Sequence, residues 1–90
     1  MEKNLTAQEA AESHRQALRE ENRRLRYLRF LVDLALMEIR AGRYTRPEAE
    51  RIVANVRSQA LQLFPGKELA FELIYQPRFR RVIAETFQLH

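Results

Sequence analysis

Apolar residues recur at spacings of three and four along the first 40 residues, the pattern of one face of an α-helix. Thr6 followed by Glu9 has the spacing of a capping box, and Gly42 is the kind of residue that commonly closes a helix. Nothing between Ala7 and Ala41 breaks a helix. The sequence therefore predicts one helix of roughly 35 residues, about 50 Å long at 1.5 Å per residue.

The apolar stripe of this helix changes character half-way along. Up to Arg24 it is mainly alanine, with one histidine and one glutamate in it. From Leu25 onward further apolar residues extend it most of the way around the helix, so we expect the second half to be surrounded and the first half to touch at most one neighbour. The stripe consists of Ala7, Ala10, His14, Ala17, Leu18, Glu21, Leu25, Leu28, Val32, Ala35, Leu36 and Ile39. The broad part adds Tyr27, Phe30, Leu31, Leu34 and Met37.

A second helix of about 18 residues is predicted after Gly42. Thr45 and Glu48 repeat the capping-box spacing, and Pro47 fits the first turn because its missing N–H would have no partner there. The segment Phe64-Pro65-Gly66 ends this helix, since a residue before proline avoids the helical conformation.

The last quarter of the chain predicts one or two further helices. A third helix from about Lys67 to Tyr75 is so apolar that we expect it to be buried on several sides. Pro77 either starts a fourth helix or kinks the third. The residues that follow have one apolar face, made of Phe79, Val82, Ile83, Thr86 and Phe87.

Composition limits the fold class. The chain has 90 residues, of which 46% are hydrophobic and 31% charged, a balance typical of a single folded domain. Two glycines and three prolines are too few for a protein of many short strands. We therefore predict a small all-α domain of four helices with a long N-terminal helix, in which residues 1–24 form a projecting arm and residues 25–90 a compact core. We expect it to be dimeric or bound to a partner.

The predicted location is the cytoplasm. The chain has no cysteine, so it depends on no oxidising compartment. Residues 1–18 lack the apolar run of an export signal. The most apolar segment, residues 27–39, contains Arg29, Asp33 and Glu38 and is shorter than the roughly 20 residues that span a bilayer. We expect no membrane segment.

No catalytic, metal or cofactor site is predicted. His14 and His90 are far apart in the sequence, and no glycine-rich phosphate loop or nucleophile–base pair is present. Glu68 and Glu72 share a helix face but are expected to lie in solvent or to pair with arginines. The second and third helices could form a helix-turn-helix, but Glu68 and Glu72 make the third a poor reader of DNA. We expect no enzyme activity.

Positive charge is concentrated in one segment. Residues 1–14 carry a net charge of −2 and residues 15–29 one of +4, within a total of +4. This cluster could bind phosphates, or it could be a solvated face that pairs with acidic neighbours, some in a second subunit; we favour the second because acidic and basic residues are mixed along the arm. The cluster comprises Arg15, Arg19, Arg23, Arg24, Arg26 and Arg29.

The overlong first helix suggests the function. An 18-residue helix of about 27 Å cannot cover one of about 50 Å, so the first half needs a partner outside its own chain. We therefore predict a non-catalytic protein–protein interaction module, an adaptor or small regulatory subunit that pairs with itself or another protein in a coiled coil. The alternative is an arginine-dependent nucleic-acid-binding protein using the cluster above. The predicted partner contacts are Leu18, Leu25, Leu28, Val32, Arg15, Arg19 and Arg26.

Overall fold

The computed structural model describes residues 6–88, and over these residues the chain forms helices with no strand. The predicted all-α fold with a long N-terminal helix is confirmed. The helices, in chain order, are α1 (Ala7–Arg40), α2 (Arg46–Leu63), α3 (Glu68–Ile74) and α4 (Gln76–Thr86).

Helix α1 runs unbroken for 34 residues. The Thr6 hydroxyl accepts a hydrogen bond from the Glu9 backbone N–H at 3.1 Å and donates to the Glu9 carboxylate at 3.0 Å. One of the free amides of the first turn is thereby satisfied. At the other end, Gly42 adopts a φ of 72°, which a residue without a Cβ atom reaches at no steric cost. The predicted helix and its two ends are confirmed to within one residue.

The start of α2 carries the complete capping box. The Thr45 backbone N–H donates to Glu48 Oε1 at 2.9 Å, and the Glu48 N–H donates to Thr45 Oγ1 at 3.3 Å. Pro47 lies in the first turn, as predicted. Further along, Pro77 also lies in a first turn, that of α4, so it starts a fourth helix instead of kinking the third.

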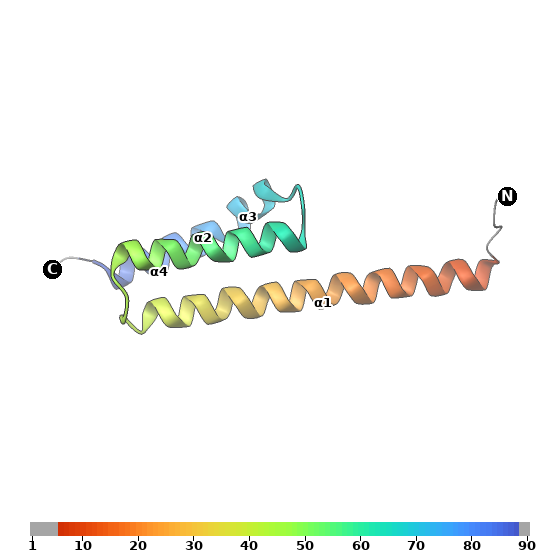
Figure 1. Cartoon of the computed structure of the whole chain (residues 1–90), viewed down its shortest axis with the longest axis horizontal. Helices are drawn as coiled ribbons and strands as arrows, with labels where there is room; N and C mark the ends of the chain where they lie inside the picture. The colour runs from red at the N-terminus through yellow and green to blue at the C-terminus, as the bar shows by residue number, and fades with distance from the viewer. Residues whose placement is uncertain (1–5, 89–90) are drawn as a thin grey trace.

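The four helices pack at one end of an elongated molecule of 68 × 20 × 17 Å. Helix α2 returns antiparallel along the second half of α1, and α4 packs against both of them (Figure 1). Helix α3 packs against α2 and α4. The first half of α1 extends beyond the other helices (Figure 1).

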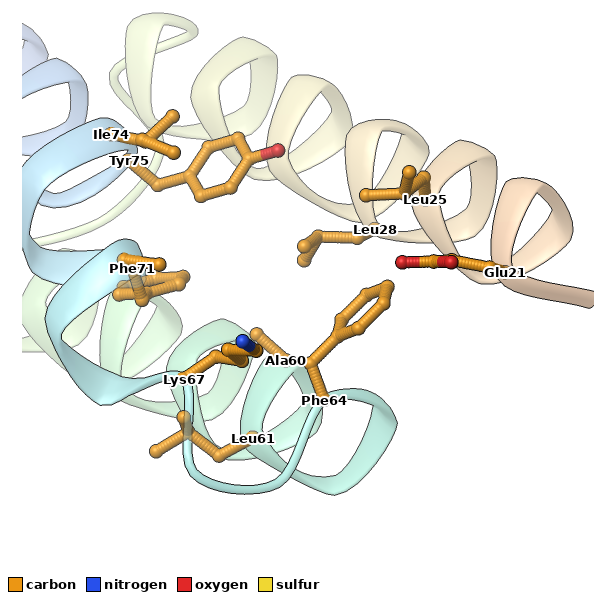
Figure 2. A pocket seen from close by; sticks show the side chains of 11 residues that line it. Glu21, Leu25, Leu28, Ala60, Leu61, Phe64, Lys67, Phe71, Ile74 and Tyr75 are labelled. Atoms are coloured by element: carbon orange, nitrogen blue, oxygen red, sulfur yellow. The ribbon is translucent and has the colours of Figure 1, made fainter. Parts of the chain in front are cut away.

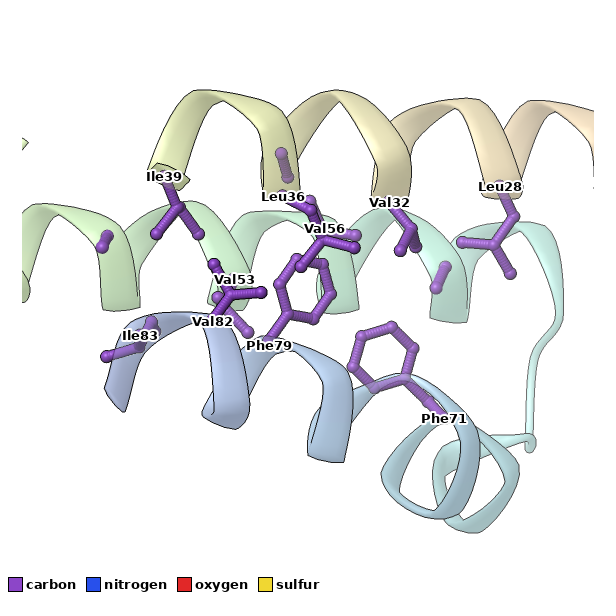
Figure 3. Packing of buried hydrophobic residues seen from close by; sticks show 13 residues of the cluster. Leu28, Val32, Leu36, Ile39, Val53, Val56, Phe71, Phe79, Val82 and Ile83 are labelled. Atoms are coloured by element: carbon purple, nitrogen blue, oxygen red, sulfur yellow. The ribbon is translucent and has the colours of Figure 1, made fainter. Parts of the chain in front are cut away.

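The core lies where α1, α2 and α4 meet. Phe79 of α4 is completely buried there, between α1 and α2 (Figure 3). Over the described residues, no polar or charged side chain is buried, so apolar packing alone stabilises the interior. The core side chains are Leu28, Val32, Ala35, Leu36, Ile39, Ala49, Val53, Val56, Ala60, Phe71, Phe79, Val82 and Ile83.

Two expectations about burial are wrong. In α3 only Phe71 is buried, whereas Leu69, Leu73 and Ile74 are more than half exposed. In the second half of α1, which was expected to be surrounded, Tyr27, Phe30 and Met37 are 48%, 59% and 60% exposed, and Leu31 and Leu34 are half-buried. The reason is the number of neighbouring helices: α2 and α4 cover one side of α1, and no other helix within residues 6–88 packs against its other side.

Replacing Phe79 by alanine is expected to lower the free energy of unfolding by about 3–5 kcal/mol, because it leaves a cavity at the centre of the core. The matched control is Phe30→Ala, which removes the same atoms from an exposed position and should cost less than about 1 kcal/mol. Urea unfolding followed by circular dichroism measures both. Equal losses for the two variants would contradict the core described here.

The capping box makes stability depend on acid pH. The hydrogen bond from the Thr45 backbone N–H, helped by the Thr45 hydroxyl, lowers the pKa of Glu48 below its usual 4.5. A carboxyl group with a depressed folded-state pKa stabilises the protein above its unfolded pKa, and this contribution is lost as the pH falls through the folded value. The melting temperature of wild type should therefore exceed that of Glu48→Gln at neutral pH, and the difference should shrink below pH 4.5. A difference that does not change with pH would show that the charge of Glu48 is not involved.

Candidate interaction surface

The first half of α1 makes no packing contact that buries a residue. Every residue from Thr6 to Arg24 is exposed, and burial begins with Leu25, which is half-buried, and Leu28. The cause is the difference in length between α1, with 34 residues, and α2, with 18. We call the exposed part of α1, residues 7–24, the arm.

The arm carries one line of mostly apolar residues that continues a buried line of the core. Positions 11, 18 and 25 lie seven residues apart and lead to Val32 and Ile39, while positions 7, 14 and 21 lead to Leu28 and Ala35. We call this line the seam. It consists of Ala7, Ala11, His14, Leu18, Glu21 and Leu25. Leu18, in the middle of the arm, is 45% exposed.

The structure corrects the predicted set of partner contacts. Leu28 and Val32 are 5% and 0% exposed, because α2 and α4 cover them. Both are buried in the core of their own chain and do not lie on the exposed part of α1. Leu18 and Leu25 remain accessible, as do the predicted charged contacts Arg15, Arg19 and Arg26.

An apolar groove lies where the arm joins the core. It has a volume of about 290 Å³ and runs between α1 on one side and the end of α2 with α3 on the other. The rings of Phe64 and Tyr75 point from that second side toward Leu25 and Leu28 of α1 (Figure 2). The pattern of the sequence did not reveal this groove, because α1 and α3 are far apart in the chain. Its lining residues are Glu21, Leu25, Leu28, Ala60, Leu61, Phe64, Lys67, Ala70, Phe71, Ile74 and Tyr75.

Half of the arginine cluster is paired within the arm. Arg15 and Arg19 contact the carboxylate of Glu12 at 2.8 and 3.5 Å, and Arg24 contacts Glu20 at 3.8 Å. These side chains are more than half exposed or close to it, so each pair contributes at most about 1 kcal/mol to stability.

The other half of the cluster is unpaired among the described residues: Arg23, Arg26 and Arg29 make no ion pair there. Arg15, Arg26 and Arg29 share a stripe with Asp33, which pairs with Arg78 of α4 at 3.6 Å. Arg19 and Arg23, four and eight residues after Arg15, lie near the same stripe, whereas Arg24 lies on another side of α1. Five of the six arginines therefore share one side of α1, and two of these five, Arg15 and Arg19, are paired with Glu12. This is the side of α1 that the nucleic-acid-binding alternative would use.

The remaining candidate groups lie apart from one another. His14 is exposed on the arm, and His90 lies outside the described residues. Glu68 and Glu72 are exposed, and Glu72 contacts Arg57 of α2 at 3.4 Å, which is the arginine pairing expected from the sequence. Within residues 6–88, no three potential ligands among His, Asp and Glu are grouped around a metal-sized site.

Comparison with known proteins gives no relative: no family model matches the chain, and neither a curated protein nor a solved structure is significantly similar to it. Over the part of the chain that the structure describes, no helix combines the length and the apolar character needed to cross a membrane.

The boundary between the arm and the core predicts that the same substitution destabilises the protein to different degrees at Leu18 and at Leu28. Leu28→Ala should lower the free energy of unfolding by about 2–5 kcal/mol, because Leu28 is buried in the core. Leu18→Ala should cost less than about 1 kcal/mol when the protein is dilute enough to have no partner. Denaturant unfolding at low protein concentration measures both. A large loss for Leu18→Ala under these conditions would show that the arm folds back onto its own chain.

Proposed function

We propose that the chain is a non-catalytic protein–protein interaction module, an adaptor or small regulatory subunit, whose contact element is the arm of α1. The observation that supports this proposal is the seam. It is a mostly apolar line in phase with the core, and its residues from Ala7 to Glu21 are all exposed.

The physics of isolated helices supports a partner for the arm. A helix shorter than about 12–15 residues is marginal in water, and a longer one gains most of its stability from packing its apolar face. The arm is about 18 residues of helix without a packed face. A second helix laid along the seam would bury Leu18 and the alanine methyl groups, which is the way amphipathic helices bind in grooves and coiled coils.

The charges of the arm contribute selectivity. The guanidinium groups of Arg15 and Arg24 lie beside the seam, where their ion pairs with Glu12 and Glu20 of the same helix are exposed to solvent, and guanidinium groups pair well with carboxylates at interfaces. We therefore propose a partner segment that carries acidic side chains. The proposed location is the cytoplasm, since a chain without cysteine needs no oxidising compartment.

The test is isolation of the native complex from the source cell with tagged full-length protein. We compare wild type with Leu18→Glu and with Gln16→Glu, a matched control that adds the same charge on the opposite side of the arm. We expect wild type and Gln16→Glu to retain a protein partner and Leu18→Glu to lose it by about tenfold or more, because a charge in the seam must be desolvated.

Two results would contradict this function. Recovery of nucleic acid instead of protein, with binding that falls steeply with salt and equally in both variants, would indicate the arginine-dependent alternative. A strictly monomeric protein, with a well-ordered arm and nothing bound, would remove the reason for assigning a contact role to α1.

A further inference from the structure

We infer that the partner of the arm is the arm of a second copy of this chain, paired antiparallel, with the first turn of each α1 seated at the groove of the other copy. This inference rests on the proposed function and specifies the partner, its direction and its register.

The antiparallel direction follows first from the length of α1 that α2 and α4 leave uncovered. The seam and the buried line of the core lie on the same face of α1, and α2 and α4 occupy that face from Leu28 onward. A partner helix on the seam must therefore end near Leu25. An antiparallel second copy meets this condition because its α1 begins at that point, whereas a parallel copy would bring its own α2 and α4 to the level of the first core.

The direction also follows from charge. Residues 6–14 contain Glu9 and Glu12 and no arginine or lysine, whereas residues 15–29 carry a net charge of +4. Antiparallel pairing places the acidic segment of each copy against the basic segment of the other. Parallel pairing would place the two basic segments together and Glu21 against Glu21 within the seam, which like-charge repulsion disfavours.

The register follows from the heptad spacing and from the length of the free face. In an antiparallel pair, residues of the line 11, 18 and 25 in one copy face residues of the line 7, 14 and 21 in the other. The possible registers therefore differ by seven residues. One of these registers places Ala7 opposite Leu25, Ala11 opposite Glu21 and His14 opposite Leu18 of the second copy. Ala7 and Ala11 then face the larger Leu25 and Glu21, and His14 and Leu18 meet at the centre of the overlap. A shift of seven in one direction would push the partner onto buried Leu28 and Val32, and a shift in the other would leave Glu21 and Leu25 uncovered.

This register also places a segment of the second copy at the groove. The overlap from position 7 to position 25 is 19 residues, or about 28 Å of helix. At its end the first turn of the second copy reaches Leu25, which lines the groove together with Phe64 and Ile74. The alanine methyl groups of that turn are small enough to enter an apolar groove of about 290 Å³ (Figure 2). Each copy thus receives the start of the other, and both grooves are covered.

Cysteine cross-linking tests the register directly, because the chain has no cysteine of its own. Full-length Ala11→Cys and Glu21→Cys proteins are mixed in equal amounts and oxidised mildly. We expect the mixed disulfide as the major product, since these positions face each other in the inferred register. Each variant alone should give little dimer, because two copies of the same position lie about 15 Å apart along the axis and a disulfide needs Cα atoms within about 7 Å.

Light scattering on the unmodified chain gives the second measurement. Wild type and Gln16→Glu should have the mass of a dimer, and Leu18→Glu that of a monomer. A disulfide formed by Glu21→Cys alone would show parallel pairing and overturn the inference. A monomeric wild type without cross-linking in the mixture would overturn self-pairing altogether; recovery of a different, Leu18-dependent protein partner from the cell would then leave the proposed function standing.

Discussion

The difference in length between the first two helices determines how this protein is built. Helix α2 ends after 18 residues, so it covers only the second half of the 34-residue α1. Where α2 and α4 lie against α1, the helical face closes into a core around Phe79; where they are absent, the same face stays in solvent. The core, the groove and the arm therefore all lie along one face of α1. They differ in which other helices cover that face.

Local sequence signals were sufficient for the helices themselves. The capping threonines, Pro47 and the two glycines act within a few residues of their position, so the ends of α1 and α2 could be predicted closely. The core face of α4 was predicted for the same reason, because Phe79, Val82 and Ile83 follow the helical period and are all buried.

Burial along the chain was less predictable because it depends on distant neighbours. Leu25 and Leu28 look alike in the sequence, yet Leu28 is buried in the core whereas Leu25 is half-buried and lines the open groove. Leu69 and Leu73 are exposed because the seven-residue α3 lies at the edge of the bundle and, of the described helices, packs against α2 and α4 alone. The groove likewise required knowledge of the tertiary fold, as it joins residues of α1 to residues more than 30 positions later.

The continuity of α1 has a consequence for recognition. A helix of 34 residues without a break transmits the orientation of its anchored end along its whole length, so the rotation of Leu18 about the helix axis is determined by the packing of Val32 and Ile39. The direction of the binding face is therefore set by the core before any partner arrives. A partner that packs along the seam stabilises the arm in an orientation that the fold already determines, so even a contact surface made largely of alanine can support specific binding.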